Sequence, residues 1–191
     1  AIGMTLVIVA GGIDLSVGST IALTGVLCAS LLREGVSPLP AVLACVLAGG
    51  AIGLVNALAI TRLRVVPFIA TLGMMGVARG LAKWLAGQTT VDAPPTAVND
   101  LAVTFPPAPW MLVSPGVWLA LVLAVLMAFV LRRTVFGRRA FALGSSEAAA
   151  RACGIDTDRL KLAIYGVAGL FFGLAGVMQM SRLRQGDPTV A

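Results

Sequence analysis

An aspartate inside a glycine-rich stretch is the first candidate for chemistry in this sequence. Asp14 follows Gly11 and Gly12 and precedes Ser16 and Ser19, between apolar segments. A glycine pair permits a sharp backbone turn, and an aspartate just before a helical stretch is typical of an N-cap, whose carboxylate accepts from the free amides of the next turn. At a break between two helices, the same groups could instead face a polar solute. The two hypotheses are compatible, because a capped half-helix can also border a cavity.

A short alanine-rich segment is the second candidate. Ser145 or Ser146 can cap a helix there, and Glu147 lies in its first turn, where a negative charge complements the helix dipole. Alanines favour helix as far as about Cys153, and Gly154 fits the position just past a helix end. Two turns are too few for a stable isolated helix, so this helix needs a neighbour. That neighbour is either its own loop or the groove of a partner protein.

Residue patterns that catalysis requires are missing from the sequence. The chain has no histidine, no G-x-x-x-x-G-K-[ST] phosphate loop and no G-x-S-x-G nucleophile elbow. Its cysteines, Cys28, Cys45 and Cys153, lack the spacing of a metal or redox site. We therefore predict that the chain is not an enzyme and has no cofactor or metal.

The elements that position these candidates follow from an apolar composition. Hydrophobic residues make up 59% of the chain and charged residues 12%, against about 45–50% and about 25% in soluble domains. Charge-free runs cover 15–32, 35–61, 101–131 and 162–181. About 20 residues of helix cross the hydrocarbon layer, and continuous apolar runs favour helices over barrel strands. The sequence predicts an all-α polytopic membrane protein.

We expect a single membrane domain over 1–191, a bundle of about five transmembrane helices. The predicted segments are the spans 1–13 (partial), 15–32, 38–60, 65–84, 115–131 and 162–181, a proline-rich external loop 87–114 and a cytoplasmic loop 132–161. The 65–84 segment either crosses the membrane, with Arg79 and Lys83 extending toward the headgroups, or re-enters on the same side.

The basic residues predict an orientation. The net charge of +6 does not indicate a nucleic-acid partner, because the Lys and Arg residues flank apolar spans. Alternating spans place Arg62, Arg64 and the loop 132–161 on one side, which carries more Lys and Arg than the other. The positive-inside rule makes that side cytoplasmic. We expect a multi-pass protein of the cytoplasmic membrane, surrounded by lipid.

Three small-residue pairs predict close helix packing. They match G-x-x-x-G at Gly49/Gly53, Gly76/Gly80 and Gly169/Gly173. Such pairs let helix backbones approach closely, either inside one bundle or at a dimer seam.

Three motifs resemble the ribose/xylose/galactose-type permeases of bacterial ABC importers. They are Gly-Gly-Ile-Asp-Leu-Ser-Val-Gly-Ser at 11–19, Phe-Ile-Ala-Thr-Leu-Gly-Met-Met at 68–75, and the stretch 137–155, which resembles that family's EAA-like cytoplasmic loop. The resemblance runs almost end to end, with a departure at Ser146, where Asn is common in the family. Full-length members are longer on both sides, so we expect an internal fragment of a permease.

The resemblance implies the permease subunit of an importer for a monosaccharide or similar small polar solute. It implies three partners: a separate ATP-binding subunit, a periplasmic or lipid-anchored sugar-binding protein, and a second permease copy. Residues of the implied ATPase-coupling loop are Gly144, Ser145, Ser146, Glu147, Ala148, Ala149, Arg151, Gly154 and Ile155. Residues implied near the translocation path are Gly12, Asp14, Ser16, Ser19, Phe68 and Thr71.

Two other functions are weighed against this one. An ion-coupled secondary transporter would need ionisable groups deep in several spans, and only Asp14, with Arg79 or Lys83, qualifies. A membrane scaffold would explain the glycine pairs but not the basic, helix-bearing loop. The exact sugar is not readable, and pentoses, hexoses and sugar-like signalling molecules all fit.

Overall fold

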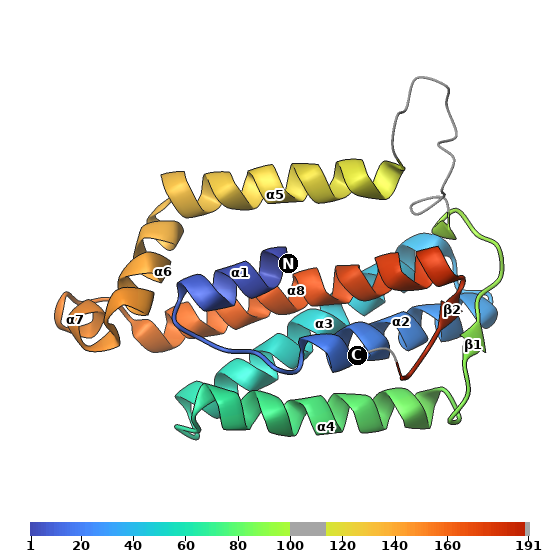
Figure 1. The fold of residues 1–191 in the computed structure, drawn as a ribbon, viewed down its shortest axis with the longest axis horizontal. Coiled ribbons are helices and arrows are strands. Elements are labelled where there is room, and N and C mark those ends of the chain that lie inside the picture. Colours follow the sequence, from blue (N-terminus) through green and yellow to red (C-terminus); the bar gives the residue numbers. More distant parts are fainter. Residues whose placement is uncertain (100–113, 190–191) are drawn as a thin grey trace.

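The computed structural model describes residues 1–99 and 114–189, which form an α-helical bundle (Figure 1). Its elements are α1 (Ile2–Val9), α2 (Val17–Arg33), α3 (Pro38–Thr61), α4 (Pro67–Leu85), β1 (Val91–Asp92), α5 (Pro115–Arg133), α6 (Val135–Ser145), α7 (Glu147–Ala152), α8 (Thr157–Leu183) and β2 (Gln185–Gly186). Part of the predicted external loop, residues 100–113, lies outside the described residues.

The all-α membrane class predicted from composition is confirmed. Within the described residues, three helices are long and apolar enough to cross a membrane, namely α3, α5 and α8, and α2 is a shorter apolar helix. Proline occupies the first turn of α3, α4 and α5, where its missing amide hydrogen breaks no helical bond and its fixed φ favours the helix. This preference explains why the three helices begin at Pro38, Pro67 and Pro115.

The centre of the bundle is a close contact between α3 and α8, which lie side by side in Figure 1. A Cβ atom added at Gly49 would clash with the carbonyl of Gly169, and one added at Gly53 would clash with the carbonyl of Tyr165. At Gly173 the added atom would lie 2.6 Å from the carbonyl oxygen of Cys45. Two of the three predicted G-x-x-x-G pairs therefore pack against each other inside this chain, and we call this contact the glycine seam.

The third pair has a different environment. A Cβ atom at Gly76 or Gly80, on α4, would meet no other atom of the described structure within 4 Å. The helix α4 runs without interruption from Pro67 to Leu85 along the bundle (Figure 1).

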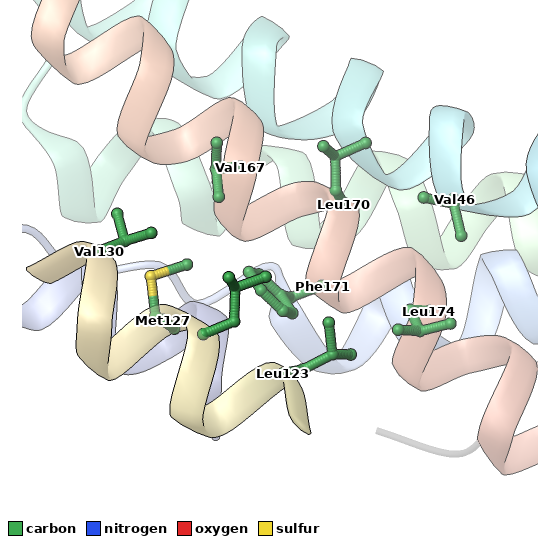
Figure 2. A pocket seen from close by; sticks show the side chains of 9 residues that line it. Val46, Leu123, Met127, Val130, Val167, Leu170, Phe171 and Leu174 are labelled. Atoms are coloured by element: carbon green, nitrogen blue, oxygen red, sulfur yellow. The ribbon is translucent and has the colours of Figure 1, made fainter. Parts of the chain in front are cut away.

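Helix α5 packs less closely on the bundle than α3 does. A cleft of about 330 Å³ separates it from α8 and α3 (Figure 2), and the side chains that line the cleft are all apolar. Leu123 and Met127 of α5 face Phe171 and Leu174 of α8 across it (Figure 2). The chain thus combines closely packed helices with a loosely attached α5.

A two-stranded antiparallel pairing, which the sequence analysis did not predict, closes one end of the bundle. Val91 pairs with Gly186 and Asp92 with Gln185, so the segment after α4 is tied to the segment after α8. The hydroxyl of Ser181 also donates to the carbonyl of Val98 over 2.6 Å. The opposite end carries α6 and α7 (Figure 1).

Candidate functional site

The glycine-rich stretch forms a break between two helices. Helix α1 ends at Val9, and α2 begins only at Val17. Gly11 has a φ of +74°, a conformation that glycine adopts without the strain that a side chain would add. Gly12 lies against α8, since an added Cβ atom would be 2.7 Å from the Tyr165 hydroxyl. We call residues 10–16 the break.

Asp14 lies inside the break but is not the N-cap of α2, so that part of the prediction is wrong. The N-cap is Ser16, whose side chain makes no capping bond. The Asp14 carboxylate instead accepts from the Ser16 amide over 2.8 Å and from the Ser16 hydroxyl over 2.6 Å. These bonds close a local turn between Asp14 and the residue two positions later. Helix α2 itself starts later than the position of Asp14 suggested. Asp14 is 2% exposed.

Asn56 completes this buried polar group and was missed by the sequence analysis. Its side-chain amide on α3 donates to the Ser16 hydroxyl over 3.0 Å, so a chain of bonds runs from α3 through Ser16 to Asp14. An asparagine in the charge-free run 35–61 was the available signal, because a buried amide in an apolar helix requires a polar partner. Asn56 therefore anchors the break to α3.

Several polar atoms beside the break have no hydrogen-bond partner within the described structure. They are the side-chain carbonyl oxygen of Asn56 and the hydroxyl oxygens of Ser19 and Thr20. Ser19 and Thr20 follow Ser16 by about one helical turn, so they lie on the same side of α2. Unpaired buried polar atoms are costly in an apolar bundle. The start of α2 therefore has polar atoms that are free to accept or donate a hydrogen bond.

The two predicted path residues on α4 lie apart from this polar group. Thr71 is fully buried, and its hydroxyl donates to the carbonyl of Pro67 in its own helix over 2.9 Å. Phe68 is half exposed. No hydrogen bond joins either residue to the break in the described structure, although α4 does pack against α2.

The predicted short helix is present as α7, with Ser146 as its N-cap. The Ser146 hydroxyl accepts from the Ala149 amide over 3.2 Å, and Gly154, just past the helix, has a φ of +79°. Both terminal signals read from the sequence are confirmed, and Ser146 rather than Ser145 is the cap. The side chains of Ala148 and Ala149 face outward.

Helix α6, immediately before α7, was not predicted. Its N-cap Thr134 accepts from the Gly137 amide over 3.3 Å, and it buries Ala140 and Leu143. The spacing of Phe136, Ala140 and Leu143 was the available signal, since residues separated by four and three positions share a helix face. We call α6 and α7 together the hairpin.

Ion pairs attach α7 to the start of α8. The ammonium of Lys161 lies 2.7 Å from Glu147 Oε1, and the guanidinium of Arg151 lies 3.1 Å from the same oxygen. Arg151 also bonds Thr157 Oγ1 over 2.8 Å and lies 3.6 Å from Asp158. The hydrogen bond from Lys161, with the positive charges of Lys161 and Arg151, holds the pKa of Glu147 below its usual value.

A polar crevice of about 480 Å³ lies between these groups and the turn from α3 to α4. Its lining includes Arg64, Val66 and Pro67 on one wall and Glu147 and Lys161 on the other. The two basic segments that the alternating spans assigned to one side therefore do lie at one end of the bundle.

The hairpin touches the break directly. A Cβ atom at Gly144 would clash with the carbonyl of Val9, and one at Gly11 would lie 3.3 Å from the Cα atom of Gly144. Two motifs more than a hundred residues apart thus meet backbone to backbone. In the described residues, no three His, Cys, Asp or Glu side chains are grouped as a metal site.

Comparisons with known proteins agree with this architecture. The chain is 39% identical to the ribose import permease protein RbsC of Escherichia coli over 99% of this chain and 59% of that protein. It is 37% identical to the L-arabinose ABC transporter permease protein AraH of Azospirillum brasilense, over 98% of this chain and 54% of that protein. It is 32% identical to the autoinducer 2 import system permease protein LsrC of Photorhabdus luminescens, over 96% of this chain and 54% of that protein.

This chain spans less than two thirds of the length of each of these relatives. No solved structure matches it. All three relatives are named as permeases of import or ABC transport systems. A family model described as the branched-chain amino acid transport system / permease component matches residues 1–191, so the chain belongs to this family of transport permeases.

Proposed function

We propose that this chain forms the membrane path of an ABC-type importer for a small polar solute in a bacterial cytoplasmic membrane. The observation that carries the proposal is the hairpin, a pair of short helices between two apolar helices, α5 and α8, at the end of the bundle. The outward-facing Ala148 and Ala149 form a small apolar surface that suits the groove of a separate ATP-binding subunit. A hairpin so placed would carry motion from that subunit to the spans.

The proposed solute is a monosaccharide or a sugar-like molecule. The named relatives are permease proteins for ribose import, for an L-arabinose ABC transporter and for autoinducer 2 import. The polar group at Asp14, Ser16 and Asn56, with the free hydroxyls of Ser19 and Thr20, supplies hydrogen-bonding atoms at the break. Such atoms suit a solute that is rich in hydroxyl groups.

In the proposed mechanism, ATP binding closes two ATP-binding subunits, which displaces the hairpin and reorients the helices. A binding protein would deliver the solute on the far side, and a second permease copy would complete the path. This chain would contribute the polar break and the surface that receives the motor, and ATP chemistry would take place in the separate subunit.

The test is uptake in cells of the source organism, using radiolabelled ribose and L-arabinose. The proposal expects uptake that requires the permease gene and stops when the Walker lysine of the ATP-binding subunit is replaced. Uptake that survives this replacement but collapses with an ionophore would instead establish an ion-coupled transporter. Unchanged uptake of every tested sugar after deletion of the permease gene would overturn the sugar assignment.

A further inference from the structure

We infer that Glu147 faces its own chain rather than the motor, and that Glu147 and Lys161 are positioning residues that fasten the hairpin to α8. This inference rests on the proposed function, since it concerns how motion of the hairpin reaches the solute path. It departs from what the loop's resemblance implied, which placed Glu147 among the residues that couple to the ATPase.

The geometry of the Glu147 carboxylate carries the inference. A single oxygen, Oε1, receives both the Lys161 ammonium at 2.7 Å and the Arg151 guanidinium at 3.1 Å. The Lys161 side chain is only 20% exposed, whereas that of Glu147 is 41% exposed. A lysine withdrawn from water in this way needs a carboxylate partner. Because two cations of this chain already bond Glu147, the carboxylate is a poor anchor for a third.

The position of Lys161 connects the hairpin to the break. Tyr165 lies one turn further along α8, on the same face as Lys161. Tyr165 is 3% exposed, its hydroxyl donates to the carbonyl of Ile13 over 3.4 Å, and it packs against Gly12. The ion pair therefore joins α7 to the turn of α8 that holds the break.

The contact of Gly144 with Val9 and Gly11 is the other connection between hairpin and break. With the ion pair in place, α7 moves together with α8. The break then follows them as one unit, because Gly144 of the hairpin and Tyr165 of α8 both contact it. Without the pair, α7 can shift with the motor while α8 stays behind. Loss of the pair should therefore uncouple ATP hydrolysis from solute movement rather than stop hydrolysis.

The experiment is a charge exchange in the complete importer, assembled with its ATP-binding subunits in vesicles. The variants are Glu147→Lys, Lys161→Glu and the double variant, and the readouts are ribose uptake and ATP hydrolysed per ribose transported. We expect each single variant to lower uptake at least about fivefold while hydrolysis continues. We expect the double variant to recover most of the uptake, because it restores a pair of opposite charges.

Arg159→Glu is the matched control. It makes the same reversal two residues from Lys161, at a side chain that is 87% exposed and that, within the described part of the chain, forms an ion pair with Asp156 alone at 3.0 Å. We expect wild-type uptake from this control. Lys161→Gln and Glu147→Gln remove one charge without reversing it, so they report on coupling even where a reversal variant does not reach the membrane.

Three results would overturn the inference: wild-type uptake in both Lys161 variants, no recovery in the double variant, or equal damage from Arg159→Glu. Each leaves the proposed function intact, since the wild-type importer would still transport. Failure of the proposed function is seen separately, as absence of ATP-dependent uptake of the tested sugars by the wild-type assembly.

Discussion

Helix α8 is held in two places by different means. In its middle, the glycine seam brings its backbone against that of α3, with Gly53 and Gly169 leaving no room for a side chain. At its start, the ion pairs of Glu147 and Arg151 attach α7 to it, with partly exposed side chains. The seam depends on steric fit, whereas the hairpin depends on charge and on a helix cap.

The glycine seam and the ion pairs therefore respond differently when the helices are displaced. Close backbone contacts have a steep distance dependence, so α3 and α8 move as one body or not at all. The strength of an ion pair changes only gradually with distance, so the pair continues to hold α7 on α8 when the two helices shift slightly against each other. A motor that displaces the hairpin would thus move α8 through the ion pairs, and α3 would follow α8 because the glycine seam is rigid.

The largest expected effect comes from filling the seam. Gly53→Ala places a methyl group against the Tyr165 carbonyl, which forces α3 and α8 apart along the whole contact. Overpacking typically costs about 1–3 kcal/mol and occasionally more, and we expect the upper end of this range because backbone rather than a side chain must give way. We expect less protein in the membrane and a lower unfolding temperature in detergent, measured by immunoblot and by circular dichroism.

Gly76→Ala is the matched control, because Gly76 lies in the same sequence pattern on α4 with no atom of the described structure within 4 Å. Alanine also favours helix over glycine by about 1 kcal/mol, so wild-type or slightly higher stability is expected. An equal loss of stability in Gly53→Ala and Gly76→Ala would show that steric fit at the glycine seam does not stabilise the bundle.

A smaller effect is expected at the break, which lies between the seam and the hairpin. Asp14→Ala removes the acceptor of the Ser16 amide and hydroxyl. The expected cost is about 1–3 kcal/mol, because the hydroxyl can rotate toward another acceptor and only the amide is left fixed and unsatisfied. Asp14→Asn keeps an acceptor oxygen at the same place and should unfold near the wild-type temperature. If both variants unfold alike, the hydrogen bonds to Ser16 do not stabilise the break.

Local signals in the sequence were sufficient for most of the long helices and for several helix ends, but not for α6 or for the start of α2. Prolines at 38, 67 and 115 begin helices, and Ser146 and Gly154 begin and end α7, because each acts through its own backbone. The prediction for Asp14 was wrong because an aspartate can close a turn of its own just before the N-cap residue of a helix.

Features that depend on two distant segments could not be predicted in the same way. The sequence pattern of Gly76/Gly80 is identical to that of Gly49/Gly53, and nothing local says which pair meets another helix. The bond from Asn56 to Ser16 joins residues 40 positions apart, and the contact of Gly144 with Gly11 joins the two candidate sites. These pairings are properties of the packed bundle.

The smallest expected effect is confined to the hairpin. Ser146→Ala removes the acceptor of the Ala149 amide, and loss of an N-cap costs about 1 kcal/mol. Because α7 has only 6 residues, this cost should open α7 locally without changing the unfolding of the bundle. We expect amide hydrogens of 149–152 to exchange about fivefold faster by mass spectrometry.

Two matched substitutions complete this comparison. Ser146→Asn should exchange at the wild-type rate, since asparagine caps as well as serine. Ser145→Ala changes the exposed neighbour at the end of α6 and should have no effect. If the amide hydrogens are equally protected in Ser146→Ala and Ser145→Ala, the ion pairs to α8 hold α7 without help from the cap. The attachment of α7 to α8 would then depend on charge alone.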